Sequence, residues 1–252
     1  PLIADISHWF SKKRGIAVAI IASGNYLSGV IWSPFIAYIL TSGDWREIYL
    51  ILALVISFVV IPLSFYLRKK KTEIRSAPSD IKNYLQTPKI AISGRHLQFF
   101  LGVAGVGCCI AMAMPQVHIV AYCVGLGYGP TIGAEMLSLM LACGVISRIS
   151  FGICADRLGG FYTLILSSTL QMLSLFLFLP FNGMTSLYVV SAVFGLSQGG
   201  IVPSYTIVVR EFLPAHEAGQ RIGIVLMLTI FGMAIGGWMS GWIFDQTGSY
   251  QI

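Results

Sequence analysis

The chain has 252 residues, of which 56% are hydrophobic and only 10% are charged, and its mean hydropathy is +0.80. A soluble domain carries about 25% charged residues, so this composition excludes an ordinary soluble fold. The formal net charge of +6 bears on membrane orientation rather than on nucleic acid, which we do not expect as a partner. We expect an all-α, polytopic membrane helical bundle, because the apolar runs reach the roughly 20 residues that a bilayer-spanning helix needs.

Seven apolar runs follow one another along the chain, and their lengths suit transmembrane helices rather than strands. The first run carries Gly24, Gly29 and Pro34, and small residues of this kind let helix backbones approach closely in lipid. Pro115 is expected to interrupt the third run, and Pro203 lies inside the sixth. The expected spans are residues 16–40, 48–67, 97–124, 131–153, 161–179, 187–209 and 222–244.

One long polar segment, residues 68–96, separates the second span from the third and has the prolines, serines and basic residues of a surface linker. It divides the chain into residues 1–67, the end of an N-terminal half-bundle with two full spans, and residues 97–252, a C-terminal half-bundle with five. Most of the 16 Lys and Arg fall on the linker's side of a seven-span topology. The positive-inside rule therefore places the linker in the cytoplasm and the C-terminal end outside.

An internal repeat supports two similar halves. Residues 14–29 and 221–237 share a basic residue, a glycine one or two positions on, an apolar stretch and two glycines about five apart. Both stretches cross the membrane in the same direction under this topology. The basic linker lies between them, as expected if two half-transporters were joined by a cytoplasmic loop.

Arg148 is the only basic residue deep within an apolar run. A charge at that depth costs about 3 kcal/mol on insertion scales, so it normally faces a cavity or a partner rather than lipid. Arg148 precedes Asp156 at the end of the same span, and the intervening helix places it roughly 12 Å inward. A guanidinium is a rigid fork suited to a carboxylate. Anion binding and structural pairing with helix carbonyls are both compatible with this position.

The same span ends in a charged tight turn that contains Asp156, Arg157, Gly159 and Gly160. The glycines permit the chain to reverse where the helix ends. Glu211 and other charged residues of the next loop on the same side are candidate partners for the turn. A loop that is charged merely because it lies inside is the structural alternative.

These residues resemble the major facilitator superfamily of secondary transporters. The resemblance is carried by Gly152-x3-Asp156-Arg157-x-Gly159-Gly160, by the glycine and proline spacing of the first span, and by the basic central loop. The stretches WFSKKRGIA before the first span and FDQTGSY after the last are similar to the monocarboxylate and oxalate/formate branch. The resemblance implies a piece of a twelve-span protein with two pseudo-symmetric halves, covering about spans five to eleven.

The resemblance also implies a function. It implies that the protein moves a small, monocarboxylate-like organic anion by alternating access, driven by proton symport or anion exchange, in the plasma (inner) membrane. Arg148 would bind the carboxylate, and the turn at Asp156 would form ion pairs, with Glu211 and Arg221 as partners, that break as the inside gate opens. Two positions differ from relatives. Gly144 stands where animal monocarboxylate carriers have an acid, and span 222–244 lacks the second basic residue of oxalate carriers.

Further polar residues are candidates for the substrate path, since breaks near prolines free backbone carbonyls that can line it. Each also has a structural alternative, because a lone His near a helix end is commonly structural and small polar residues hold helices together. The candidates are Asn25, Tyr26, His118, Gln198 and Tyr205.

Other classes of function have weaker support. No Walker loop, metal-ligand spacing or Ser/His/Asp arrangement is present, so we expect no enzyme, cofactor, metal site or obligate protein partner. A seven-helix receptor or sensor is an alternative, because seven spans are visible. A major-facilitator transporter of a non-carboxylate solute is another.

Overall fold

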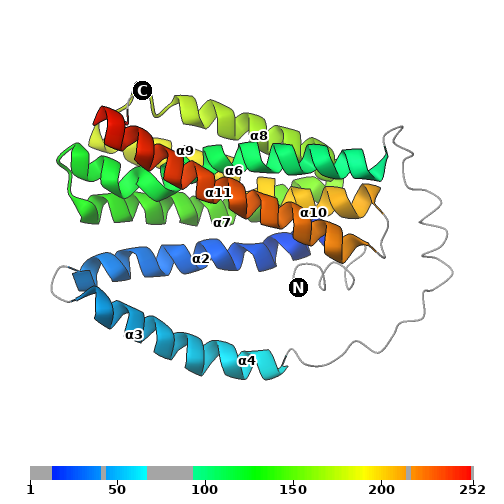
Figure 1. The fold of residues 1–252 in the computed structure, drawn as a ribbon, viewed down its shortest axis with the longest axis horizontal. Coiled ribbons are helices and arrows are strands. Elements are labelled where there is room, and N and C mark those ends of the chain that lie inside the picture. Colours follow the sequence, from blue (N-terminus) through cyan, green and yellow to red (C-terminus); the bar gives the residue numbers. More distant parts are fainter. Residues whose placement is uncertain (1–12, 41–43, 67–92, 214–216, 251–252) are drawn as a thin grey trace. The chain divides into compact units, whose positions relative to one another are not determined.

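The structure, a computed structural model, describes residues 13–40, 44–66, 93–213 and 217–250, and every regular element in these residues is a helix (Figure 1). The chain forms two compact units, one made of Pro1–Pro34 with Ile90–Ile252 and the other of Phe35–Lys89. Most of the expected linker, residues 68–96, lies outside the described residues.

The smaller unit contains one helical stretch with a local irregularity. It consists of α3 (Trp45–Val55), the π-helical turn η1 (Ile56–Val60) and α4 (Ile61–Tyr66). Pro62 has no amide hydrogen for the carbonyl one turn earlier, so the wider turn just before it relieves the mismatch. The stretch coincides with the second expected span.

The larger unit is a bundle of antiparallel helices joined to the first part of α2 (Arg14–Leu40), the helix of the first expected span. Three long helices form its body. These are α6 (Gly94–Gly125), α7 (Pro130–Leu158) and α11 (Ala218–Thr247). Three shorter ones complete it, namely α8 (Gly160–Phe176), α9 (Met184–Gln198) and α10 (Ile201–Phe212).

These helices confirm the expected fold class. Within the described residues, 6 helical segments are long and apolar enough to cross a membrane, the pair α9 and α10 being counted as one segment. The fifth expected span coincides with α8, whose 17 residues are slightly shorter. The protein is therefore an integral, multi-pass membrane protein.

Two prolines behave differently from each other. The expected interruption at Pro115 is wrong, because α6 continues through it as one helix. A transmembrane helix tolerates such a proline when neighbouring groups satisfy the freed backbone. In the sixth span the helix does break, at Gly199 and Gly200, between α9 and α10 and just before Pro203.

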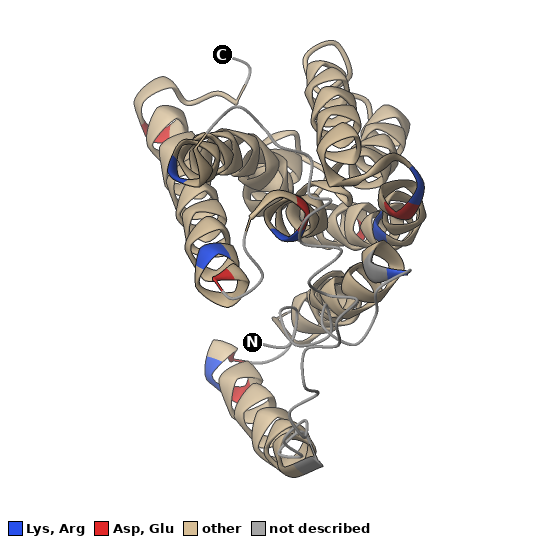
Figure 2. Ribbon diagram, turned by 90° about the vertical axis from the view of Figure 1, so that its right-hand side faces the viewer, with Lys and Arg blue, Asp and Glu red and all other residues tan. Residues whose placement is uncertain are grey.

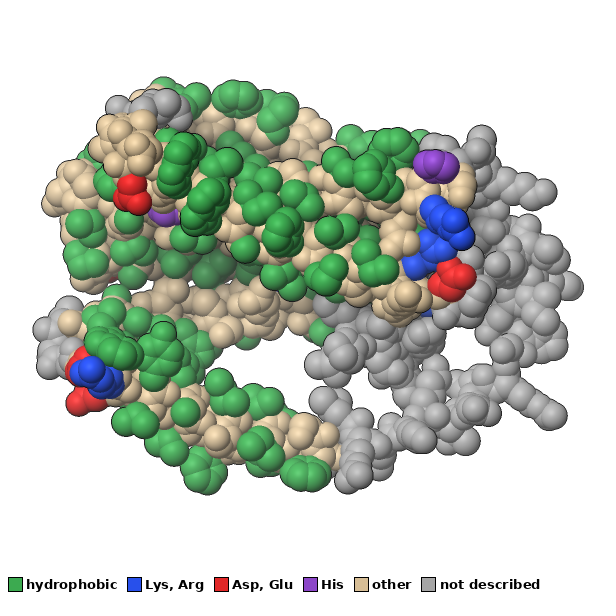
Figure 3. Space-filling model, in the orientation of Figure 1, with side chains coloured by type: hydrophobic (Ala, Val, Ile, Leu, Met, Phe, Trp, Pro, Cys, Tyr) green, Lys and Arg blue, Asp and Glu red, His purple; other side chains and the backbone are tan. Residues whose placement is uncertain are grey.

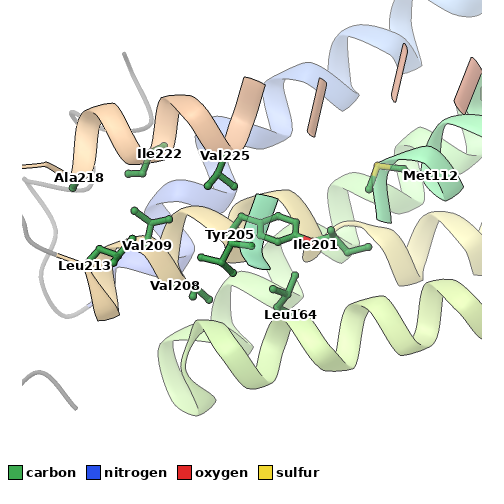
Figure 4. Close-up of a cluster of buried hydrophobic side chains, with 11 residues drawn as sticks. Met112, Leu164, Ile201, Tyr205, Val208, Val209, Leu213, Ala218, Ile222 and Val225 are labelled. Carbon is green, nitrogen blue, oxygen red and sulfur yellow. The ribbon is translucent and has the colours of Figure 1, made fainter. Parts of the chain in front are cut away.

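The core of the larger unit lies where α10, α11, α6 and α8 meet. Figure 4 shows the cluster of buried side chains there, with Tyr205 among Ile201, Val208 and Val225. Hydrophobic side chains cover the sides of the helices in Figure 3. Charged residues of this unit gather mainly at the helix ends (Figure 2). We call the end that carries Asp156 the motif end, and the opposite end the far end.

Candidate functional site

Arg148 is buried in the middle of α7, with 4% of its surface exposed. Its Nη1 donates a hydrogen bond to the carbonyl oxygen of Ala22 on α2. Its Cζ lies 3.6 Å from the centroid of the Tyr26 ring, in a cation–π contact. Its Nε is buried and has no hydrogen-bond partner among the described residues. The structural alternative predicted that Arg148 pairs with a helix carbonyl. The Ala22 carbonyl does accept from Arg148, but it satisfies only one of the guanidinium nitrogens.

Tyr26 reaches from α2 into the space beside Arg148 and is itself 4% exposed. Its hydroxyl lies 3.8 Å from the sulfur of Met112 on α6. Gly144, one turn before Arg148, makes this position available, because a Cβ added there would lie 2.6 and 2.7 Å from two ring carbons of Tyr26. The missing side chain at Gly144 therefore provides room for an aromatic ring.

A pair of amides bridges α6 and α9. Nε2 of Gln116 donates to Oε1 of Gln198 at 2.9 Å, and Gln198 is only 1% exposed. Nε2 of Gln198 has no hydrogen-bond partner among the described residues. Gln198 is among the candidates predicted from the sequence, whereas Gln116 is not, although its place directly after Pro115 in an apolar run was an available signal.

The broken end of α9 lies against the backbone of Arg148. The hydroxyl of Ser147 donates to the carbonyl of Leu196 at 2.6 Å and accepts from the amide of Gly199 at 3.2 Å. A Cβ added at Gly199 would lie 2.6 Å from the amide nitrogen of Arg148. Contacts thus connect α7 to α2, α2 to α6, α6 to α9 and α9 back to α7, around buried polar groups.

Two other candidates lie apart from these contacts. Asn25 is exposed on α2, on a different face from Tyr26. Tyr205 is buried in the hydrophobic cluster of Figure 4, and its hydroxyl has no hydrogen-bond partner among the described residues. Neither is in contact with Arg148 in this structure.

His118 lies toward the far end and connects α6 to α11. Its Nε2 lies 2.8 Å from the carbonyl oxygen of Gly237 and its Nδ1 lies 3.0 Å from the hydroxyl of Tyr250. A carbonyl can only accept, so Nε2 of His118 donates to Gly237, while Nδ1 lies within hydrogen-bond distance of the Tyr250 hydroxyl. Burial, followed by the charge of Asp245, raises the pKa of Tyr250, which favours its neutral hydroxyl. The structure does not bring His118 together with Arg148.

At the motif end, the Asp156 carboxylate caps α2. Oδ1 accepts from the amide of Gly15 at 2.6 Å, and Oδ2 accepts from the amide of Ile16 at 3.1 Å. Both amides belong to the first turn of α2, where unpaired N–H groups and the helix dipole favour a negative charge. At Gly152, one turn earlier on α7, an added Cβ would lie 3.2 Å from the Cα of Ile16, so the two backbones touch there.

The glycines of the turn behave as their sequence predicts. Gly159 has a φ of 85°, a left-handed value that favours glycine, between α7 and α8. The amide of Gly160 donates to both carboxylate oxygens of Glu211, at 3.0 and 3.1 Å. Glu211 is thus in contact with the turn, through a backbone amide rather than through Arg157, which is exposed.

Arg221 makes its hydrogen bonds to residues outside the turn. It bonds Glu217 through Nε at 2.7 Å and Gln98 through Nη1 at 2.7 Å. The same Nη1 lies 3.4 Å from the carbonyl of Gly94, so Arg221 connects the first turns of α11 and α6. In this structure the turn and Arg221 are separate features of the motif end.

A buried arginine, a charged glycine turn and a bundle of long apolar helices define a membrane protein with a polar interior site. The sequence model of the Major Facilitator Superfamily matches residues 2–237, and the chain belongs to that family. It is 25% identical over 252 residues, 99% of its own length, to monocarboxylate transporter 13 of Rattus norvegicus and, equally, of Bos taurus. It is 24% identical over 243 residues to the MFS-type transporter pynF of Aspergillus niger.

The chain spans 55% to 58% of the length of these curated relatives. The family match removes the main support for a seven-helix receptor and agrees with the expectation that the protein is not an enzyme.

Proposed function

We propose that the protein is a secondary active transporter that moves a small, monocarboxylate-like organic anion across the membrane by alternating access. Arg148 binds the anion's carboxylate. The single observation that carries the proposal is the buried guanidinium of Arg148, whose Nε has no hydrogen-bond partner among the described residues. A buried cation with an unused donor is costly to keep unless a ligand uses it.

The substrate class is supported by the chemistry of buried donors on α7 and α9. Nε of Arg148 and Nε2 of Gln198 are both buried donors, and both suit the oxygen atoms of an organic acid. The similarity to proteins named monocarboxylate transporter 13 points in the same direction. Tyr26, whose ring lies against the guanidinium of Arg148, and Gln198, buried on α9, are assigned to the substrate path.

The gate in this proposal is the motif end. The bonds from Gly15 and Ile16 to Asp156 join α2 to α7, and they can break and re-form as the two halves rock. Glu211 fixes the turn by binding the Gly160 amide, while Gly152 lets the two helices touch. We assign Arg157 and Arg221 to the same end, Arg221 as the residue that holds α11 against α6.

The orientation of the protein in the membrane and the energy source of transport are part of the same proposal. The protein lies in the plasma (inner) membrane with residues 68–96 in the cytoplasm, so the motif end faces inward. Without an ATP site in the sequence, transport is driven by proton symport or by exchange for a second anion. His118, Asn25 and Tyr205 are not assigned to carboxylate binding, since they do not contact Arg148.

The test is uptake by the product of the complete reading frame, purified into proteoliposomes. Radiolabelled acetate, pyruvate, benzoate and oxalate are supplied with and without an inward proton gradient. Arg148→Ala is compared with Arg46→Ala, which removes an exposed arginine whose side chain is 71% accessible. We expect monocarboxylate uptake that Arg148→Ala abolishes and Arg46→Ala preserves. Equal uptake by Arg148→Ala and the wild type would make Arg148 structural and end the proposal.

A major-facilitator transporter of a non-carboxylate solute is the second candidate. The observation that favours it is the 24% identity over 238 residues to a protein of Paecilomyces divaricatus named agnestins efflux protein AgnL12. Protein that takes up none of the four anions, but exports a non-carboxylate solute from loaded vesicles, would support this candidate instead.

A further inference from the structure

The guanidinium of Arg148 has two kinds of edge, and they are not equally available. Nη1 is occupied by the carbonyl of Ala22 on α2. Nε is buried and has no hydrogen-bond partner among the described residues. The N–H of Nε and one N–H of Nη2 point in parallel from the same side of the planar group, so they form a two-donor fork. That fork is the edge left for a ligand.

The Tyr26 ring determines how a ligand reaches that edge. The ring centroid lies 3.6 Å from Cζ of Arg148, so the ring covers one face of the guanidinium. The Tyr26 hydroxyl lies 3.8 Å from the Met112 sulfur, which positions the far side of the ring against α6. With Cζ held over the ring and Nη1 bonded to Ala22, the guanidinium is held at two places, and its Nε side is left for a ligand.

Gly144 decides whether the ring can occupy this place. A Cβ at residue 144 would lie 2.6 and 2.7 Å from ring carbons of Tyr26, closer than real Cβ contacts come. An alanine at this position would therefore push the ring away from the guanidinium. The glycine and the tyrosine act as a pair, although they belong to different helices.

We propose that a carboxylate binds Arg148 side-on, through the Nε–Nη2 edge, and that Tyr26 is a positioning residue that holds the guanidinium in the plane required for this contact. Gly144 provides the space for the Tyr26 ring. The proposal rests on the anion-binding role of Arg148 proposed above. It also limits the ligand, because one fork accepts one carboxylate group.

The pairing of Tyr26 with Gly144 makes a double-mutant cycle possible. Uptake of the fastest of the four labelled anions is measured in proteoliposomes for Tyr26→Leu, Gly144→Ala, the double variant and Tyr26→Phe. The control is Gly24→Ala, on the same helix as Tyr26 but with open space around it. Rates are normalised to the amount of protein that elutes as a single folded species.

The expected result is a change in KM rather than in kcat. Losing a buried cation–π contact that orients the arginine should raise KM about tenfold in Tyr26→Leu and in Gly144→Ala. The double variant should have the KM of either single variant, because the added methyl group acts by displacing the Tyr26 ring, which the double variant lacks. Tyr26→Phe keeps the ring and should retain the wild-type KM, as should Gly24→Ala.

Three results would overturn the proposal. In the first, the double variant has a KM raised by the product of the two single effects. In the second, Tyr26→Phe has a KM as high as that of Tyr26→Leu. In the third, Tyr26→Leu has the wild-type KM while Arg148→Ala abolishes uptake. If Gly144→Ala yields no folded protein, the comparison of Phe with Leu at residue 26 still tests whether the ring positions Arg148. Wild-type uptake by Arg148→Ala is a separate outcome, which removes the proposed function and this inference together.

Discussion

Two helix pairs in the larger unit are both packed through glycines, but they differ in what else holds them. On α11, Gly232 and Gly236 lie one turn apart against the backbone of α6. A Cβ added at Gly232 would lie 2.9 Å from the Cα of Val106, and one at Gly236 would lie 2.8 Å from the Cα of Ile110. In lipid, such close packing is a main source of helix association.

The pair α2 and α7 combines close packing at a glycine with hydrogen bonds made by charged side chains. Gly152 lets the backbones meet near Ile16, while Asp156 caps the first turn of α2 and Arg148 bonds Ala22. Hydrogen bonds from amides at a helix end can exchange with water when that end opens, whereas backbone packing in the bilayer has no such replacement. We therefore interpret α6–α11 as a fixed scaffold and α2–α7 as a contact that changes during transport.

The largest effect on stability is expected for Gly236→Ala. Overpacking a close helix contact costs about 1–3 kcal/mol, so thermal unfolding in detergent should begin at a clearly lower temperature. The control is Gly223→Ala, on the same helix with open space around it, where alanine stabilises a helix by about 0.5–1 kcal/mol. Equal unfolding temperatures for these two variants would remove the distinction between scaffold and gate.

Gly152→Ala should affect transport more than folding. Its Cβ would lie 2.7 Å from the Cβ of Ala19, so the cost falls on α2–α7, which can separate without disrupting α6–α11. We expect a lower uptake rate with an unfolding temperature closer to the wild type than that of Gly236→Ala. A drop in unfolding temperature as large as in Gly236→Ala, with normal uptake per folded molecule, would contradict the account.

Asp156→Asn should have a smaller effect on the same contact. Losing a charged cap costs about 1 kcal/mol, so the equilibrium between the two gate states should shift several-fold. The maximal uptake rate should change while KM stays within about twofold, because Asp156 lies about two turns of α7 away from Arg148, the proposed binding residue. Glu211→Gln, which weakens the acceptor for the Gly160 amide, is the companion variant. A KM effect with an unchanged rate would place Asp156 in binding instead of gating.

The smallest effect concerns Tyr250 at the far end. Its pKa is raised, chiefly by burial and then by Asp245, so the folded protein favours the neutral hydroxyl. Its contribution to stability should be complete below about pH 10, the ordinary pKa of tyrosine, and should be lost as the pH rises further. Tyr250→Phe should reduce this alkaline loss. Identical pH profiles of unfolding for wild type and Tyr250→Phe would refute this assignment.

Much of the fold could be predicted from the sequence because lipid imposes simple rules. Apolar length located the membrane-spanning segments among the described residues, and the burial of Arg148 followed from the cost of a charge at that depth. The tight turn at Gly159 followed from its glycines. These features depend on local composition, which a single sequence displays.

The contacts between helices could not be predicted in the same way. The partner of Asp156 is a helix end 140 residues away, and Arg221 bonds α6 rather than the turn. Gln116 was missed because its role depends on facing Gln198, and the break expected at Pro115 was wrong because neighbours decide whether a proline opens a helix. Rotation and depth of each helix set these pairings, and apolar length does not encode them.

The most direct test of the central claim separates binding from movement. Equilibrium binding of the labelled anion with the fastest uptake is measured on purified protein for the wild type, Arg148→Lys and Arg148→Ala. The account predicts saturable binding by the wild type, weaker binding by the lysine variant, which keeps the charge but loses the fork, and none by the alanine variant. Binding by Arg148→Ala with the affinity of the wild type would contradict it.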